Sequence, residues 1–497
     1  RFTAEKKTEP DARMQNENFW KEHRPLALSP SEDRLSLFVE RIYNIEGFSP
    51  IIWVGKSLIE NYIPTSIDPK DPSKLDIGPV NTTVTTNPVD GVRLRASLQT
   101  TANLNPHMFW RGYLAYGFRD QRWKGLGEVT YSFRRKAYLP MEFPVSNLTF
   151  TYSYDVSVPS DQYLTTDKDN VFMAFKWADV KHMTYDRSFK LVYDQEWDYG
   201  LQWRAQLRHD MTEPTYKLFY QPVVNGIHYD AQGNYNPRPF GPGDGTSFSA
   251  RNRRYLRTTD FSVLLQYQPG VAYINTKQRR ILVNKEAPIY RISHMAGLRG
   301  VWSDYTYNLT EVGVRKRVWL RSWGRMDFDF AAGAQWNRVP FPLLIMPRAN
   351  LAYVYDDDMY YLVDNMEFLN DRYAQLMFNW SMNGKIFNRI PLFNRLKWRE
   401  HVGFNILWGQ LTDKNNPYLE KNKTRSDLYY FPGEFNPDGS FRQQSKVMDP
   451  QVPYVEAAFG IHNIFKLFHI DYVRRFTYLN DPRTTRWGIR FMARVIF

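Results

Sequence analysis

The residues of this chain whose types could support catalysis are few and poorly spaced. His209 and Asp210 are adjacent near the expected end of a strand, where the histidine–carboxylate dyad of a hydrolase could sit. Neighbouring side chains of a strand point to opposite faces, so this pair cannot act together without a bulge. No nucleophile elbow or second acidic pair accompanies it. The sequence therefore predicts no enzymatic activity and no catalytic residue.

Metal-binding patterns are equally weak. The nine histidines lack the H-x-H or H-E-x-x-H spacing of zinc sites, and the chain contains no cysteine. The run Asp356, Asp357 and Asp358 could attract a hard cation such as Ca²⁺, but a solvated acidic loop tip is the favoured interpretation. No P-loop, dinucleotide-binding glycine motif or EF-hand is present. We therefore predict no metal site and no cofactor.

Charged residues that alternate with apolar ones are more informative. Val92 and Leu94 alternate with Arg93 and Arg95, and similar alternation recurs in many segments. One face of such a strand suits hydrocarbon, while the other carries charge. We expect the charged faces to line a lumen, where they form an ion-pair network or, alternatively, an anion-favouring pore. The candidate members are Arg93, Arg95, Asp155, Asp327, Asp329, Arg490 and Arg494.

The residues expected in the first and last strands make the predicted charge network more specific. If the first and last strands close a barrel, Arg93 and Arg95 lie near Arg490 and Arg494. Like charges in an interior are costly unless they are paired. We therefore expect acidic partners from inward loops or from the N-terminal extension.

The C-terminal strand has an apolar face that ends on an aromatic residue. Trp487, Phe491 and Phe497 share this face, and no residue follows Phe497 in the sequence. An apolar-out strand with a terminal phenylalanine resembles the closing strand of a bacterial outer-membrane β-barrel. In such barrels the terminal aromatic belongs to the signal read by the insertion machinery.

The period-two pattern predicts the fold class. It begins near residue 77 and indicates an all-β, closed antiparallel outer-membrane β-barrel of about sixteen strands over residues 76–497. Residues 1–75 are expected to form a periplasmic extension with one or two short helices. The connections 157–182, 211–257, 339–372 and 409–451 are long and fall at one end, which places both termini in the periplasm. The strands of a soluble β-sandwich also alternate apolar and polar residues, so no single strand distinguishes a sandwich from a membrane barrel.

Composition agrees with a barrel. Aromatic residues make up 16% of the 497 residues, as in barrels with aromatic girdles. A mean hydropathy of −0.56 excludes a bundle of membrane helices but not a barrel with a polar lumen. The net charge of +13 is spread without a basic helix, which argues against nucleic acid and favours outer-membrane lipid and lipopolysaccharide. No signal peptide is present, so we expect a mature or ordered portion of a longer precursor.

Six stretches in order resemble one family of Bacteroidota outer-membrane proteins, whose members usually carry an N-terminal carboxypeptidase-regulatory-like domain before a barrel. The stretches lie within residues 19–29, 87–94, 112–125, 339–344, 383–393 and 460–475. The family more often has Glu at the position of Asp90. The resemblance implies an outer-membrane barrel, no peptidase activity and no catalytic residues to transfer. The regulatory-like domain is not recognisable in these residues.

An apolar turn is the remaining candidate site. Ile386, Phe387, Pro391, Leu392 and Phe393 form a predicted periplasmic turn that either docks the extension or another subunit, or fills the barrel rim. Together these features predict a non-enzymatic component of a larger outer-membrane complex, for protein insertion, secretion or nutrient uptake. Its partners would be other outer-membrane or periplasmic proteins. A stand-alone transporter or receptor for a small solute is the alternative.

Overall fold

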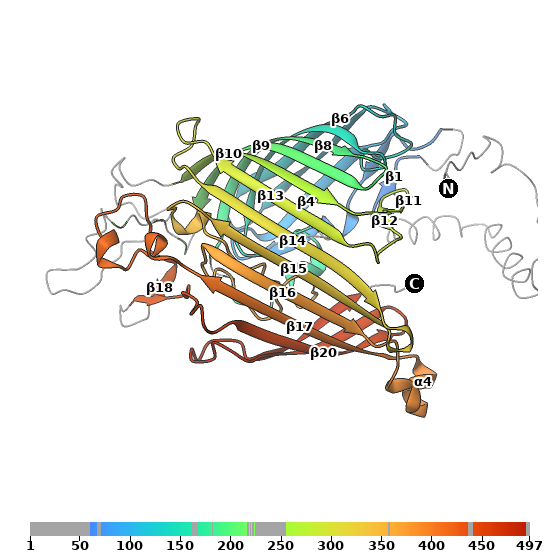
Figure 1. Ribbon diagram of the computed structural model, residues 1–497. Helices are drawn as coiled ribbons and strands as arrows, with labels where there is room; N and C mark the ends of the chain where they lie inside the picture. Colours follow the sequence, from blue (N-terminus) through green and yellow to red (C-terminus); the bar gives the residue numbers. More distant parts are fainter. Residues whose placement is uncertain are drawn as a thin grey trace, which may run out of the picture. The chain divides into compact units, whose positions relative to one another are not determined.

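The computed structural model of the chain describes residues 60–66, 71–161, 167–180, 182–215, 218, 220, 223, 255–355, 358–435 and 441–493. Most of the predicted extension, part of the acidic run, Arg494 and Phe497 lie outside these residues. Within them, one large antiparallel sheet dominates (Figure 1). No described helix is long and apolar enough to cross a membrane.

The sheet is assembled almost entirely in chain order. At its first edge, β1 (Ile63–Pro64) pairs with β2 (Leu75–Ile77), and both β2 and β3 (Val84–Asn87) pair with β4 (Gly91–Thr100). The following strands each pair with the next, and all overlap ranges expected from the alternation: β5 (Met108–Gly117), β6 (Arg122–Ser132), β7 (Ser146–Ser157), β8 (Thr184–Glu196), β9 (Leu201–Pro214), β10 (Leu256–Tyr267), β13 (Ile289–Gly297), β14 (Asn308–Trp319), β15 (Arg325–Gln335), β16 (Arg372–Ser381), β17 (Arg399–Gln410), β20 (Tyr454–Ile464), β21 (Phe468–Arg475) and β22 (Trp487–Ala493).

Small elements decorate the connections. Two separate hairpins are formed by β11 (Tyr273–Asn275) with β12 (Arg280–Leu282) and by β18 (Gly433–Phe435) with β19 (Phe441–Gln443). The short helices are η1 (Val80–Thr82), η2 (Val171–Ala174), η3 (Arg321–Trp323), η4 (Phe341–Leu343), η5 (Phe387–Arg389), α4 (Pro391–Leu396), η6 (Asp413–Asn415) and η7 (Glu420–Asn422).

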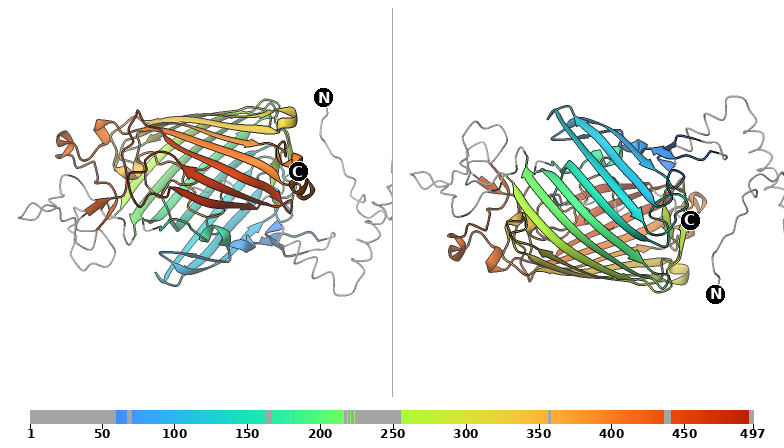
Figure 2. Two further views of the ribbon diagram at one scale, coloured as in Figure 1. Left: turned by 90° about the horizontal axis from the view of Figure 1, so that it is seen from below. Right: turned by 90° about the horizontal axis from the view of Figure 1, so that it is seen from above.

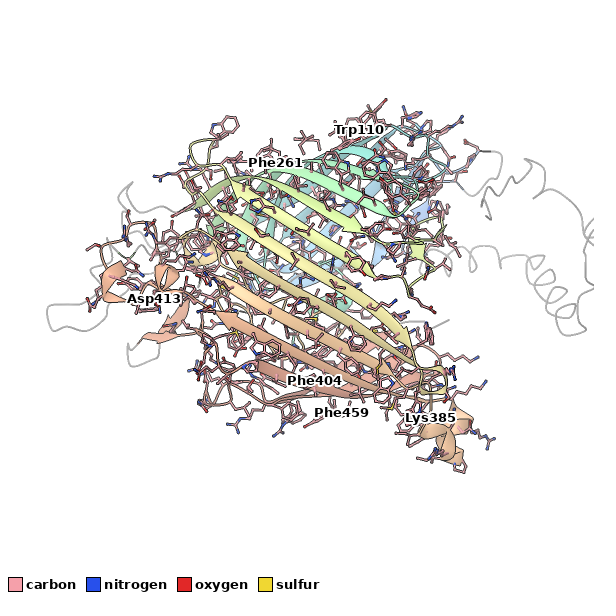
Figure 3. The ribbon with its side chains drawn as sticks, in the orientation of Figure 1. Trp110, Phe261, Lys385, Phe404, Asp413 and Phe459 are labelled. Atoms are coloured by element: carbon pink, nitrogen blue, oxygen red, sulfur yellow. The ribbon has the colours of Figure 1, made fainter. Side chains whose placement is uncertain are left out.

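The two faces of the sheet are inverted relative to a soluble protein. On β4, the exposed Val92 and Leu94 alternate with Arg93 and Arg95, which are 0% and 6% exposed. Trp110, Phe261 and Phe459 are likewise exposed by 52%, 45% and 54% (Figure 3). Burying arginine while exposing aromatic residues is unfavourable in water. It is the arrangement of a barrel whose outer face meets lipid and whose inner face is polar.

The four longest connections between neighbouring strands leave the same end of the sheet. The connections 158–183, 215–255, 336–371 and 411–453 leave one end, which we call the long-loop end. Those near 133–145, 197–200, 320–324, 382–398 and 465–467 form the short-turn end. β18 and Asp413 mark the long-loop end on the left of Figures 1 and 3, and α4 and Lys385 mark the short-turn end on the right. The four longest connections therefore share one end, as expected, whereas the connection 268–288 at the short-turn end is longer than the connection 118–121 at the long-loop end.

The first and last strands do not pair with each other in the described part of the chain. The sheet curves round an interior (Figure 2), but β22 is hydrogen-bonded to β21 on one side and to a loop segment on the other. The predicted barrel closure by direct strand pairing is therefore not seen. At the β22 edge, residues of the connection between β15 and β16 lie where a neighbouring strand would pair.

Candidate functional site

The interior beside the last strands is filled by the connection between β15 and β16. We call residues 345–371 the plug loop. Ala349, Leu351, Tyr360, Val363 and Phe368 in this loop are all 0% exposed and belong to one apolar cluster with residues of the strands. Most long connections lie on the surface. Here the apolar side chains favour burial by roughly 25 cal/mol per Å² of apolar area, which draws the loop inward.

Charged side chains on the inner face of the sheet hold the plug-loop backbone. Glu456 on β20 accepts hydrogen bonds from the backbone N–H groups of Tyr361 and Leu362, at 2.8 and 3.0 Å. Arg490 on β22 donates to the carbonyl oxygen of Tyr361 at 2.8 and 3.2 Å. Buried backbone groups need such partners. Arg490, predicted as a lumen charge, therefore binds the plug loop.

An ion pair fixes the end of the plug loop. The Arg475 guanidinium on β21 lies 2.8 and 3.0 Å from the Glu367 carboxylate, and Lys446 Nζ lies 3.0 Å from it. Burial alone would raise the pKa of Glu367, but Arg475 and Lys446 lower it overall. Burial, together with the Glu367 charge, raises the pKa of the neighbouring Asp364 to about 6. At this end of the plug loop, Glu367 is thus ionised and Asp364 is readily protonated.

The plug loop also occupies the edge of the last strand. The Phe491 N–H on β22 donates to the Tyr353 carbonyl at 2.8 Å, and the Tyr355 N–H donates to the Phe491 carbonyl at 2.9 Å. On its other side, the Tyr353 N–H donates to the Phe175 carbonyl at 3.0 Å, and the Trp177 N–H donates to the Leu351 carbonyl at 3.0 Å. The segment therefore takes the place of a neighbouring strand at the β22 edge.

Residues 167–180, which we call the seam loop, continue this contact toward the first strands. Arg93 on β4 contacts Asp90 at 2.9 Å, Asp155 on β7 at 2.7 Å and Asp169 of the seam loop at 3.1 Å. All four side chains are buried or nearly so. Such a cluster is favourable only because every charge is paired. The structure thus brings two of the predicted network residues, Arg93 and Asp155, together.

Of the arginines predicted to lie near one another at the two sheet edges, those that the structure describes each contact the seam loop instead. Arg95 pairs with Asp167 at 3.0 Å and with Asp169 at 2.7 Å. Arg490 lies with its guanidinium 4.5 Å from the centre of the Trp177 ring. Both edges therefore contact the seam loop. It supplies acidic residues to the first strands and an aromatic face to the last.

Asp327 and Asp329 form a separate group on β15. Asp327 lies 2.5 Å from Arg317, and Asp329 pairs with Arg315. Arg315 also pairs with Asp358 at 2.7 Å, so the described member of the predicted acidic run contributes to an ion pair. The structure places none of these groups in the Arg93 cluster.

The predicted docking turn projects its apolar residues from the short-turn end. Ile386 and Leu392 are 50% and 60% exposed, and the rings of Phe387 and Phe393 pack with centroids 4.6 Å apart. Pro391 is the first residue of α4, where a proline suits helix geometry. On β22, Trp487 and Phe491 of the predicted insertion signal are exposed on the outer face.

His209 and Asp210 have different partners. His209 Nδ1 lies 2.9 Å from Thr259 Oγ1, whereas Asp210 accepts a hydrogen bond from Ser188 at 2.5 Å and pairs with Arg208 at 3.2 Å. The two side chains are not hydrogen-bonded to each other in the described contacts. The alternation of strand side chains accounts for this separation.

The structure brings together two groups of residues that the sequence analysis did not identify. Lys124 lies 2.6 Å from both Asp90 and Asp120, in a buried ionic cluster built from two of the stretches that carry the family resemblance. His401, His462 and Asp471 come together from three adjacent strands. Residues 462 and 471 share the inner face of one hairpin, so alternation could have paired these two. Nothing in the sequence places His401 beside them.

Three solved structures are similar to this chain at low sequence identity. BamA from Haemophilus ducreyi lacking POTRA domains 1–3 is 11% identical, covers 84% of this chain and 69% of its own, and gives a TM-score of 0.43. CdiB from Acinetobacter baumannii is 9% identical over 82% of this chain and 57% of its own, with a TM-score of 0.37. A mutant of the ferric enterobactin receptor PfeA from Pseudomonas aeruginosa is 9% identical over 79% and 60%, with a TM-score of 0.28.

No curated protein sequence matches the chain. The profile described as "Family of unknown function (DUF5686) C-terminal domain" matches residues 65–422, which is more than half of the sequence. The matched range includes the first strands, the seam loop, the plug loop and the docking turn. The chain therefore belongs to the DUF5686 family.

Proposed function

We propose that this protein is an integral outer-membrane β-barrel that acts as a non-enzymatic component of a larger outer-membrane complex. The complex would serve protein insertion, secretion or nutrient uptake. The observation that carries the proposal is the edge of β22, whose Phe491 hydrogen-bonds to Tyr353 and Tyr355 of the plug loop. The outward apolar and inward polar faces support the membrane location.

An exchangeable strand edge is suited to partner binding. Backbone N–H and C=O groups at a sheet edge can receive an added strand from another chain. In the described residues, two backbone hydrogen bonds at Phe491 join the β22 edge to the plug loop, while Glu456, Arg490 and an apolar cluster hold the rest of that loop. Each backbone bond at the edge contributes about 0.5–1.5 kcal/mol, so a partner strand with a longer ladder could replace residues 353–355 at the edge while the rest of the plug loop stays in the interior.

The docking turn supports a second contact with partners. Apolar side chains at Ile386, Ile390 and Leu392 are 50%, 42% and 60% exposed at the short-turn end. Their exposure favours docking over the filling of the rim. In the proposed orientation this end and both termini face the periplasm, where an accessory protein could bind.

A site-specific photo-crosslinker on the outer face tests the edge model. Ile489 on β22 and Ile292 on β13 are similarly exposed, at 44% and 49%, so Ile292 provides a matched control in the middle of the sheet. We expect a crosslinker at Ile489 to form a discrete adduct with one envelope protein in native membranes. The control should give only background.

Co-purification then tests membership of a complex. Extraction in mild detergent, followed by mass spectrometry, should recover other envelope proteins in stoichiometric amounts. A single pure species, together with equal crosslinking at Ile489 and Ile292, would contradict the proposal.

A stand-alone transporter or receptor for a small solute is the second candidate. It is favoured by the half-buried inner residues of β13, such as Arg291 and Ser293, which leave part of the interior less tightly packed. A stable conductance of the purified protein in planar bilayers, sensitive to one class of solute, would select this alternative. An origin in Bacteroidota and an N-terminal carboxypeptidase-regulatory-like domain remain predictions of the sequence resemblance.

A further inference from the structure

The inner face of the last strands carries a cluster of two histidines and one carboxylate. His401 lies on β17, His462 on β20 and Asp471 on β21. Gly460 on β20 is opposite both His401 and Asp471 in register, so these residues form a row across three strands. The side chains of His401, His462 and Asp471 are 2%, 8% and 0% exposed.

The possible ligand atoms point at one another. His401 Nδ1 lies 2.7 Å from Asp471 Oδ1, and His462 Nε2 lies 3.1 Å from Asp471 Oδ2. One nitrogen or oxygen from each residue lies within 4.8 Å of the others. The two imidazole rings stack with centroids 4.1 Å apart. Ligand atoms 2.0–2.2 Å from a tetrahedral zinc ion are roughly 3.4 Å apart, so only small shifts would surround an ion.

The cluster lacks a permanent positive charge. In the described part of the chain, no lysine or arginine forms an ion pair with Asp471. Arg490 is opposite Asp471 in register, but its guanidinium donates to the carbonyl oxygens of Tyr361 and Ile489. A buried carboxylate without a permanently charged partner is costly, and a divalent cation would compensate it.

Two neighbours fix the position of the carboxylate. Tyr355 of the plug loop donates a hydrogen bond from its hydroxyl group to Asp471. At Gly460, a β-carbon would lie 1.9 Å from Asp471 Oδ1, so this strand position needs glycine to admit the carboxylate. Groups that orient a ligating carboxylate commonly strengthen metal sites.

We propose that His401, His462 and Asp471 bind a divalent transition-metal ion of the zinc class. Imidazole nitrogen and carboxylate oxygen are ligands that zinc accepts, and two histidines with one carboxylate leave a fourth position for another ligand. Tyr355 orients the carboxylate and connects the site to the plug loop. Metal binding would displace protons held between the ligand atoms and join β17, β20 and β21 through one ion.

Metal titration of the purified full chain tests the site. The protein in detergent is stripped with a chelator, dialysed and titrated with Zn²⁺ by calorimetry, with metal content measured by mass spectrometry. We expect one bound equivalent, and at least tenfold weaker binding in His401→Ala and in Asp471→Asn. His294→Ala is the matched control, because His294 on β13 bonds to Thr310 outside the cluster. It should bind Zn²⁺ like the parent.

Cobalt spectroscopy provides a readout that does not depend on variants. Replacing Zn²⁺ with Co²⁺ should give the intense visible absorption of a four-coordinate site. If His401→Ala fails to show the heat-modifiable mobility of a folded barrel, His462→Gln replaces it. Absence of bound Zn²⁺ and of the Co²⁺ bands in the parent would overturn the proposal. So would an equal loss of binding in His294→Ala.

Discussion

The inward-facing residues are buried to different extents in two parts of the same sheet. On β21, the inward residues are at most 1% exposed: His469, Asp471, Val473 and Arg475. On β13, the inward residues are only half-buried: Ile289, Arg291, Ser293 and Met295. Both strands have a period of two, and both expose apolar residues outward. The difference arises from the plug loop, which packs against the strands from β16 to β22.

The interior of the sheet therefore contains two electrostatic environments. Beside the plug loop, the Arg475 and Glu367 side chains are 1% and 5% exposed. On the other side, Arg204 pairs with Asp194 while its side chain is 46% exposed. Removing one partner of a buried pair leaves an uncompensated charge, whereas exposed pairs contribute little. The two sides should therefore respond differently to the same kind of substitution.

Removing the plug loop should abolish the difference. Replacing residues 349–369 with a short glycine–serine linker removes the protein that fills the interior beside β16 to β22. We expect planar-bilayer conductance to increase by roughly tenfold or more, because large barrels without an internal plug hold water channels. Replacing the exposed tip residues 423–426 with glycine and serine is the control. An unchanged conductance after plug removal would show that other segments close the interior.

Breaking one ion pair on each side measures the two environments directly. Arg475→Met should destabilise the folded protein by about 3 kcal/mol, because the buried Glu367 loses its bidentate partner and keeps only Lys446 as a counter-charge. Arg204→Met should cost less than about 1 kcal/mol, because Asp194 regains water. Denaturant unfolding in detergent, followed by tryptophan fluorescence, compares them. Equal losses would refute the proposed contrast.

Two glycines sharpen the comparison of packing. A β-carbon at Gly460 would lie 1.9 Å from Asp471 Oδ1, whereas one at Gly127 on β6 would meet nothing within 4 Å. Gly460→Ala should therefore cost about 1–3 kcal/mol through overpacking. Gly127→Ala should change stability by less than about 0.5 kcal/mol. The midpoint of the heat-induced mobility shift on gels measures both. A neutral Gly460→Ala would mean that Asp471 can move away.

The smallest effect concerns pH and the plug loop. Burial raises the pKa of Asp364 from 3.8 to about 6, so the seated loop holds a proton that a released loop would lose. Seating should therefore weaken as pH rises from about 4 to about 6, by roughly tenfold after allowance for partial exposure. Amide hydrogen exchange of plug-loop peptides, corrected for intrinsic rates, measures this change. Asp364→Asn should remove most of the dependence. An identical profile in this variant would assign the effect to another group.

The strands and their faces could be predicted because they are encoded locally. Val92 and Leu94 face outward and Arg93 and Arg95 inward, as the alternation requires. Chain parity also predicted that the four longest connections share an end of the sheet. Arg93 and Arg490 of the predicted lumen set are buried, but the sequence did not identify their partners. Arg93 meets Asp169 of the seam loop, and Arg490 meets a backbone carbonyl.

The sequence by itself determined the antiparallel β architecture, the inversion of polar and apolar faces and the placement of the four longest connections at one end. These properties follow from a period of two and from chain parity, which need no knowledge of distant contacts. Only the tertiary structure decided that the plug loop turns inward, that it occupies the β22 edge and that His401 meets Asp471, 70 residues away. Such contacts depend on which non-local surfaces complement one another, and an irregular loop has no periodicity that records its partner.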